Sequence, residues 1–441
     1  MAESKKDAHY LSAKELREIA RENNRQIKRL EKYKKRKASC EEFTTQMQDE
    51  NNIVEFEDLK TYFFSDAGVV KAVDGVSFSI PRGSIVGVVG ESGCGKSVTS
   101  LSLMRLVQAP HGQIVSGSIR FATQDYERDE KGKVIPVYET EVIDGEEKIK
   151  YEKKTVKGKE VDVPVQKIDE KGRPVFKLKD VVYDIAKMPD RELGRIRGRE
   201  IAMIFQEPMT SLNPVFTIGN QLDEMIMLHT PDCTKQYAKE RSIKMLEMVG
   251  IAMPEDVYKR YPHELSGGMR QRVMIAISLS CSPKLIIADE PTTALDVTIQ
   301  AQILDLLRNI RKDIDGSIML ITHDLGVIAE TADLVVVMYA GRVIESGTVD
   351  EIFDNPLHPY TIGLQKSKPV INRKCDRLYS IPGQVPNPVD MPDYCYFRDR
   401  CNRCTEKCGS GYPQTVQVTP THSVACYLYE NAEVNNAEKQ K

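Results

Sequence analysis

The stretch GESGCGKS, residues 90–97, decides the fold that this sequence predicts. Gly90, Gly95, Lys96 and Ser97 satisfy the pattern G-x-x-x-x-G-K-[ST], and the apolar run SIVGVVG leads directly into it. In a strand, loop and helix of this kind, glycines let backbone N–H groups wrap a β-phosphate, and the lysine neutralises β- and γ-phosphate oxygens. The serine hydroxyl is a ligand for Mg²⁺. The stretch therefore predicts a nucleotide phosphate site.

Two apolar segments downstream, PKLIIADEP and GSIMLITHD, are typical of buried parallel strands, so alternating strands and helices predict a doubly wound α/β core. Asp289 ends the first strand, where a carboxylate holds Mg²⁺ through its water shell. Glu290 follows and can polarise an attacking water. His323 can contact a γ-phosphate, and Gln206, which ends IAMIFQ, can reach metal and water together. These residues favour nucleotide hydrolysis over a non-hydrolysing scaffold.

A second phosphate-binding feature lies far downstream in LSGGMRQR, residues 265–272. Ser266, Gly267 and Gly268 open a stretch of helical character, and such a helix start presents backbone N–H groups to a phosphate. Since residues 90–97 already provide one phosphate cradle, the chain carries two. Local pattern does not say which phosphate the second cradle serves.

The composition is that of a globular protein with more than one structural unit. At 441 residues the chain exceeds one ordinary domain, and a net charge of -3 signals neither nucleic acid nor membrane as a bulk partner. The first residues lack the apolar core of a signal peptide, and no uninterrupted apolar run approaches the length of a membrane span.

Changes of pattern predict the organisation of the chain. Residues 1–52 form an N-terminal extension and residues 53–350 a nucleotide-binding domain, which contains a β-rich insertion at 121–180, interpreted as a β-meander, and a helical subdomain at 207–283. Residues 351–441 form a separate Pro-rich and Cys-rich C-terminal element.

The N-terminal extension is predicted to be one basic amphipathic helix. Ser12 and Glu15 make a capping box, and apolar residues then recur at helical spacing. Its end, RQIKRLEKYKKRK, holds eight basic residues against one Glu. A solvated basic helix is the preferred interpretation, and contact with anionic lipid is the alternative.

The motifs together resemble the ATP-binding subunits of ATP-binding-cassette (ABC) transporters over residues 53–120 and 181–430. In chain order the matching motifs are Walker A (90–97), the Q-loop (Gln206), the signature (265–272), Walker B (285–290), the D-loop (Ala294, Leu295, Asp296) and the switch histidine (His323). The resemblance implies a P-loop NTPase fold with a RecA-like core and a helical subdomain. It also implies head-to-tail dimers, in which each ATP lies between one chain's Walker A and the other chain's signature. Ser266, Gly267 and Gly268 then serve a partner's ATP.

The resemblance also implies the full nucleotide site. Phe63 is the first candidate for an adenine platform and Tyr62 the second. Mg²⁺ ligands are Ser97, Gln206 and Asp289. The other ATP-binding residues of this prediction are Gly90, Glu91, Ser92, Gly93, Cys94, Gly95, Lys96, Val98 and Asp296, together with the three signature residues.

The C-terminal segments NPLHPYTIGL (355–364) and IPGQVPNP (381–388) are similar to those of peptide and nickel permease cassettes, and GESGCGKSVTS resembles their D-type member. This implies an ATPase that energises import of di- or oligopeptides. The alternatives are a nickel importer with the same tail and a soluble cassette that acts on ribosomes or DNA. Implied partners are an F-type ATPase subunit, two membrane permease subunits and an extracellular solute-binding protein, with no nucleic acid, at the cytoplasmic face of the membrane.

The C-terminal cysteines predict a metal site. Cys395, Cys401, Cys408 and Cys426 are spaced C-x5-C-x6-C-x17-C, which resembles the motif that holds a [4Fe–4S] cluster in many peptide-permease cassettes. Tetrahedral Zn²⁺ on Cys395, Cys401, Cys404 and Cys408 is the alternative, because C-x2-C is common in zinc sites.

Overall fold

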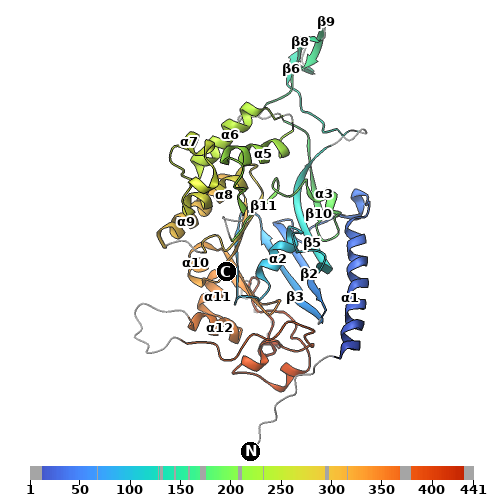
Figure 1. Cartoon of the computed structure of the whole chain (residues 1–441), viewed down its shortest axis with the longest axis vertical. Helices are drawn as coiled ribbons and strands as arrows, with labels where there is room; N and C mark the ends of the chain where they lie inside the picture. The colour runs from blue at the N-terminus through green and yellow to red at the C-terminus, as the bar shows by residue number, and fades with distance from the viewer. Residues whose placement is uncertain are drawn as a thin grey trace, which may run out of the picture.

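The structure is a computed structural model of the chain, shown in Figure 1. It describes residues 12–66, 68–127, 129, 133–143, 146–156, 159–168, 175–206, 211–231, 233–293, 297–314, 316–367 and 379–431.

A mostly parallel sheet forms the centre of the molecule. Its parallel strands are, in spatial order, β11 (Ile201–Ile204), β12 (Leu285–Asp289), β13 (Ser317–Ile321), β4 (Ile85–Val89) and β14 (Leu334–Tyr339). Every residue of β4, β12 and β13 is buried, which explains why these strands read as continuous apolar runs. The predicted α/β core is confirmed.

Strand alternation divides the core into two layers. In β12, Ile286 and Ala288 join the cluster that also contains α8 (Gly267–Leu279) and α9 (Val297–Ile314). Leu285 and Ile287 point to the other layer, which contains α2 (Lys96–Leu103). Because successive side chains of a strand face opposite ways, each central strand stabilises both layers.

The second layer is completed by an antiparallel sheet that packs on α2. Its strand order is β1 (Thr44–Thr45), β10 (Leu178–Asp184), β5 (Gly112–Tyr126), β2 (Asn52–Ser65) and β3 (Gly68–Pro81). A buried hydrogen bond of 2.8 Å between the Thr61 and Ser102 hydroxyls joins β2 to α2. The helix that follows the P-loop is thus held between two sheets.

The insertion leaves the antiparallel sheet between β5 and β10. Its described strands are the hairpin of β6 (Thr140–Ile143) with β7 (Glu146–Ile149) and that of β8 (Tyr151–Val156) with β9 (Lys159–Pro164). These hairpins project away from the body (Figure 1). The expected β structure is present, but as separate hairpins, and residues 121–126 and 178–180 belong to the body because Tyr126 pairs with Leu178.

Helices follow β11 in the region predicted to form a helical subdomain. They are α5 (Ile218–His229), α6 (Lys235–Met248), α7 (Pro254–Lys259) and then α8. The Thr217 and Thr234 hydroxyls cap α5 and α6 by accepting backbone N–H groups. Short helices elsewhere are α3 (Asp190–Leu193), α10 (Leu325–Thr331), α11 (Val349–Asp354) and α12 (Pro359–Lys366).

The N-terminal extension forms α1 (Ala13–Lys34), with the predicted capping box of Ser12 and Glu15. The helix lies along the antiparallel sheet (Figure 1). Asn23 donates a hydrogen bond of 2.7 Å to the Ser65 carbonyl, and Gln113 donates one of 2.7 Å to Glu31. Neither α1 nor any other helix in the described ranges is long and apolar enough to cross a membrane.

The C-terminal element is joined to the central sheet, whereas the sequence indicated a separate element. β15 (Arg342–Thr348) pairs with β17 (Ser423–Val424), which pairs with β16 (Val416–Gln417). Tyr360 and Phe397 lie in the main core cluster. Strands of two residues carry no readable period, so local pattern could not reveal this pairing.

Candidate active site

The P-loop, which is the Walker A stretch at residues 90–97, connects β4 to α2 and requires glycine at two positions. Gly90 and Gly95 have φ angles of 153° and 98°. A Cβ atom at Gly90 would lie 2.3 Å from the Met338 carbonyl oxygen, and one at Gly95 would lie 2.4 Å from the Ala72 carbonyl oxygen. The loop therefore keeps a backbone shape that exposes its N–H groups.

The side chain of Lys96 folds back onto the P-loop. Its ammonium group donates to the carbonyl oxygens of Gly90 at 2.9 Å and Glu91 at 3.1 Å. The side chain is buried, and Cys94 is buried beside it. Burial raises the pKa of the Cys94 thiol, so this cysteine stays neutral and adds no charge to the loop.

Ser97 and Asp289 bring α2 and β12 together. The Ser97 hydroxyl donates to Asp289 Oδ1 at 3.0 Å. Burial, helped by the charge of Glu290, raises the pKa of Asp289, while the Ser97 bond and the charge of Lys96 oppose the rise. A hydroxyl and a carboxylate are the hard oxygen donors that suit Mg²⁺. Two of the predicted magnesium ligands thus meet, whereas Gln206 contacts Glu290 instead.

Glu290 is the centre of a polar cluster at the end of β12. Its Oε2 atom accepts 2.9 Å hydrogen bonds from Gln206 Nε2 and from the Thr293 hydroxyl, and its Oε1 atom lies 3.3 Å from His323 Nδ1. Burial acts to raise the pKa of Glu290, but the bonds from Thr293 and His323 and the charges of His323 and Lys96 hold it below its usual value. The carboxylate is therefore ionised at neutral pH.

The structure assembles all three residues that the sequence nominated for catalysis. Gln206, Glu290 and His323 come from the ends of three adjacent strands, because β11, β12 and β13 are neighbours in the sheet. Sequence reasoning missed Thr293, although it lies only three residues after Glu290 of Walker B. The side chain of His323 is 66% exposed, so it can reach a ligand.

The signature region lies at the start of α8 and is satisfied by its own helix. Ser266 is the N-cap, and its hydroxyl accepts the Met269 N–H at 3.3 Å. In the described ranges no hydrogen bond joins Ser266, Gly267 or Gly268 to the P-loop of the same chain. Gln271 donates to the Pro291 carbonyl at 2.7 Å, which ties α8 to the segment after Walker B. Asp296, like Ala294 and Leu295, lies outside the described residues.

Strand alternation separates the two aromatic candidates for the adenine platform. Thr61 contacts α2, so Phe63, two residues on, faces the same side of β2 and pairs with Gly112. Tyr62 faces the other side, where its hydroxyl donates to Asp74 at 2.6 Å. The geometry favours Phe63, which lies on the face that carries the P-loop helix.

A buried arginine of the C-terminal element is hydrogen-bonded to the P-loop. Arg400 donates to both carboxylate oxygens of Glu91, at 2.7 and 3.0 Å. The Glu91 N–H donates to the Tyr360 hydroxyl at 2.8 Å, and Arg400 also reaches the Tyr339 hydroxyl at 3.3 Å. Sequence reasoning assigned no role to Arg400, because its partner lies 309 positions away.

The four cysteines of the predicted iron–sulfur motif influence one another electrostatically. Burial raises the pKa of Cys395 to about 12, with added contributions from Cys408, Cys426 and Cys401. Burial likewise raises the pKa of Cys426 to about 11, with contributions from Cys401 and Cys408. Within the described residues, however, no group of three or more His, Cys, Asp or Glu side chains could hold a metal ion. Cys404 is exposed.

Comparison with known families adds to this geometry. The model of the ABC transporter family matches residues 73–185 and 179–293, and the model of the oligopeptide/dipeptide transporter C-terminal region matches residues 344–408. The second match contains both Tyr360 and Arg400, which contact the P-loop.

Proteins of Bacillus subtilis (strain 168) are similar over most of the chain. Oligopeptide transport ATP-binding protein AppD is 44% identical over 380 residues, which are 86% of this chain and 98% of that protein. Oligopeptide transport ATP-binding protein OppD is 40% identical over 85% of this chain and 88% of its own length. Dipeptide transport ATP-binding protein DppD is 40% identical over 86% of this chain and 95% of its own length. The chain therefore belongs to the ATPases of the ABC transporter family, in the group that carries the oligopeptide/dipeptide transporter C-terminal region.

Proposed function

We propose that this chain hydrolyses ATP to energise the import of di- or oligopeptides through an ABC transporter complex. The observation that carries the proposal is the ionised Glu290 at the end of β12, held by Gln206 and His323. It occurs in a chain whose relatives are oligopeptide and dipeptide transport ATP-binding proteins. Those names favour peptides over nickel as the transported solute.

ATP binding would use the P-loop backbone and Lys96. N–H groups of Ser92, Gly93 and Cys94, with that of Val98 at the helix start, surround the phosphates, whereas the N–H of Glu91, also expected to bind ATP, stays bonded to the Tyr360 hydroxyl. Lys96 exchanges the carbonyl oxygens of Gly90 and Glu91 for β- and γ-phosphate oxygens. Phe63 stacks on the adenine, because it lies on the α2 face of β2.

Ser97 and Asp289, with Gln206, would hold Mg²⁺, which would neutralise negative charge on the phosphates. The hydroxyl–carboxylate pair at 3.0 Å supports this assignment, since both groups already converge. The amide of Gln206 can then lie between the metal site and Glu290.

In hydrolysis, Glu290 accepts a proton from the water that attacks the γ-phosphorus, the bond to the β-phosphate oxygen breaks, and ADP leaves. An ionised carboxylate is required for this step, and the lowered pKa of Glu290 provides it. His323 turns from Glu290 to the γ-phosphate when ATP is bound, since its side chain is exposed.

The signature residues Ser266, Gly267 and Gly268 would complete the ATP site of a second ABC ATPase subunit, proposed to be of the F type. Their lack of hydrogen bonds to the chain's own P-loop, in the described ranges, supports a partner as the recipient. Asp296 belongs to the same proposed interface. Hydrolysis then depends on dimer closure, which couples it to transport.

The same proposal gives the chain a peripheral position at the cytoplasmic face of the membrane. There it would drive two permease subunits, which receive peptide from an extracellular solute-binding protein. Solute selectivity resides in those partners, and no nucleic acid takes part.

We further propose that Cys395, Cys401, Cys408 and Cys426 hold a [4Fe–4S] cluster, which would crosslink the C-terminal element. The spacing of the four cysteines supports a shared site, and the Cys395 N–H donates to the Cys408 carbonyl at 3.1 Å, which brings two of them together. The zinc alternative needs Cys404, which is exposed.

Uptake by a strain that lacks this gene tests the transport proposal. Accumulation of radiolabelled di- and oligopeptides should fall to background and return with the wild-type gene, but not with Glu290→Gln. Unchanged peptide uptake together with lost nickel uptake would transfer the proposal to the nickel alternative.

A further inference from the structure

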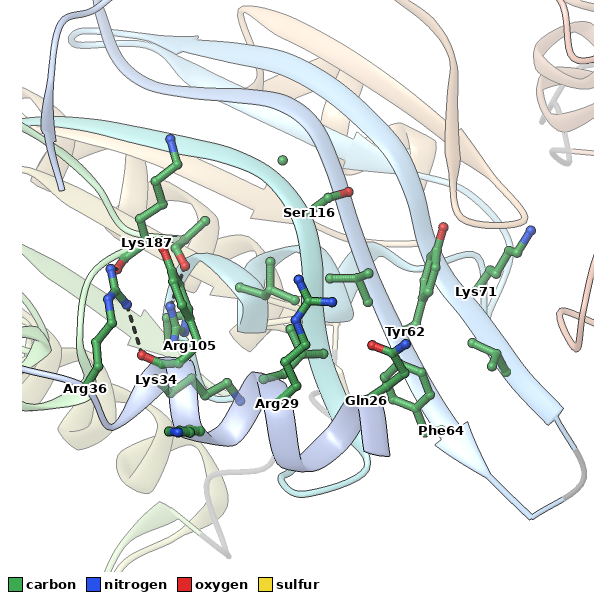
Figure 2. A pocket seen from close by; sticks show the side chains of 18 of the residues that line it. Gln26, Arg29, Lys34, Arg36, Tyr62, Phe64, Lys71, Arg105, Ser116 and Lys187 are labelled. Carbon is green, nitrogen blue, oxygen red and sulfur yellow. Dashed lines mark hydrogen bonds between the residues drawn. The ribbon is translucent and has the colours of Figure 1, made fainter. Parts of the chain in front are cut away.

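A large cavity separates α1 from the antiparallel sheet (Figure 2). Its volume is about 1020 Å³, and its walls come from α1, from β2 and β5, and from the segments around Arg105 and Lys187. It lies on the Tyr62 face of β2, opposite the α2 face. The cavity is therefore distinct from the ATP site.

The inner wall of the cavity is apolar. It contains Leu30 and Tyr33 from α1 and Tyr62, Phe64, Ile114 and Val115 from the sheet. Tyr33 is 45% exposed and Val115 38% exposed, although both are large and lie on the same cavity. A contiguous apolar surface open to solvent marks a binding surface.

The rim of the cavity is strongly basic. Among its described lining residues are seven Lys or Arg side chains and one acidic side chain, Asp390. Figure 2 shows Arg29, Lys34 and Arg36 on the α1 side, with Arg105 and Lys187 beside them. Since like charges gathered at one opening repel each other, the rim attracts an anion.

Neighbouring groups compensate only part of this charge. Lys34 pairs with Glu31 at 3.3 Å, and Lys187 pairs with Asp184 at 2.9 Å. Arg105 donates to Asp190 and to backbone carbonyls, and Arg36 has Glu42 at 3.5 Å.

Arg29 and Lys32, by contrast, are in no ion pair within the part of the chain that the structure describes. Three positions apart on α1, they lie on the same face of the helix. Both line the cavity and both are exposed. They are the cations best placed to bind a ligand from outside.

We propose that this cavity binds an anionic phospholipid of the membrane surface, with the headgroup at Arg29 and Lys32 and the acyl chain against the apolar wall. A phosphate alone would leave that wall uncovered, and an uncharged lipid would leave Arg29 and Lys32 without an anionic partner. The basic end of the extension, with eight Lys or Arg and one Glu in residues 25–37, continues the same positive surface.

The occupant would connect the N-terminal extension to the catalytic body. Tyr62 lines the cavity, and the next residue, Phe63, faces α2 on the other side of β2. A lipid that fills the gap between α1 and the sheet therefore packs directly behind the proposed adenine platform. The inference does not require ATP hydrolysis, so its test is separate from that of the transport function.

Binding of the full-length protein to vesicles tests the proposal. We expect co-sedimentation with equimolar phosphatidylglycerol and phosphatidylcholine vesicles, and little with phosphatidylcholine alone. The double variant Arg29→Gln/Lys32→Gln should weaken this binding by about 30-fold, since each basic residue near an anionic surface contributes about fivefold. The matched control Arg17→Gln/Arg21→Gln removes the same charge from α1 outside both the cavity and the basic end at residues 25–37, and should change binding less than about twofold.

Two further measurements separate the cavity from other anion sites. Val115→Trp fills the cavity without changing charge and should also reduce vesicle binding. Soluble dihexanoyl phosphatidylglycerol should bind more tightly than glycerol phosphate in titration calorimetry. An equal loss in the Arg17/Arg21 control, unchanged binding by Val115→Trp, or equal affinity for glycerol phosphate would each overturn the proposal. Circular dichroism and ATP binding should be the same in all variants.

Discussion

Two halves of this cassette differ in how their polar groups are hydrogen-bonded. The phosphate half surrounds the P-loop at residues 90–97, and the signature half surrounds residues 265–272. At the P-loop, Ser97 and Glu91 bond to partners from distant parts of the chain, while Lys96 bonds to carbonyl oxygens of the loop itself. At the signature, among the described residues, Ser266 bonds only within its own helix start, to the N–H groups of Met269 and Arg270. One half is organised by the fold of this chain, and the other presents a helix start that its own P-loop does not use.

This difference indicates where each half receives its ligand. A phosphate at the P-loop replaces internal bonds of a site that is already shaped. In the proposed dimer, a phosphate of the partner's ATP would add to the helix N-terminus at the signature, where backbone N–H groups favour an anion. Substitutions in the two halves should therefore have different effects on ATP binding and on hydrolysis.

The largest effect is expected at Glu290. Glu290→Gln keeps the bonds to Gln206 and Thr293 within reach but removes the proton acceptor, which should lower hydrolysis by about 10²- to 10⁴-fold. ATP binding should persist, and a closed dimer should accumulate. Single-turnover hydrolysis in the assembled complex measures this, and turnover near wild type at this Walker A would remove Glu290 from its role.

A large but indirect effect is expected at Ser266. Ser266→Arg should lower ATPase activity of the complex by at least about tenfold, because it crowds the phosphate position of the partner's site. ATP binding to the isolated chain should not change. Ser266→Thr, which preserves the N-cap, is the matched control and should stay close to wild type. An equal loss of ATP binding in the isolated chain would contradict a shared site.

A smaller effect is expected at Arg400, which joins the C-terminal element to the phosphate half. Arg400→Ala should weaken ATP binding by about tenfold, since a bidentate charged contact that positions the P-loop is lost. The control is Arg398→Ala. Arg398 lies in the same 3₁₀ helix, Arg398–Arg400, but bonds to Asp399 and not to Glu91. Titration with a fluorescent ATP analogue measures the nucleotide affinity of both variants. Equal affinity would mean that Arg400 does not position the P-loop for ATP.

The smallest effect on the ATP site is expected at the cysteines. Anaerobically purified protein should be brown, with about four iron and about four sulfide per chain, and Cys395→Ser, Cys401→Ser, Cys408→Ser or Cys426→Ser should bleach it. Cys404→Ser should not, and ATP binding at Lys96 should survive all five substitutions. Colourless protein with one zinc, in which Cys404 is essential and Cys426 dispensable, would contradict the cluster.

The sequence by itself determined those features whose causes are local. The P-loop could be predicted because its glycines, lysine and serine act through neighbouring atoms, and both tested glycines have φ angles that favour glycine. The strands β4, β12 and β13 could be predicted because complete burial produces unbroken apolar runs. The start of α1 could be predicted because a capping box spans only four positions.

Only the tertiary structure decided which distant segments meet. The contact of Arg400 with Glu91 and the pairing of β17 with β15 join residues far apart in the chain, and neither leaves a period in the sequence. The face on which Phe63 and Tyr62 lie was also undecided, since either could face α2 until the register of β2 was known. The cavity behind α1 depends on how a helix with few apolar residues rests on a sheet. Such packing arises from the shapes of both partners, which one local stretch of sequence does not contain.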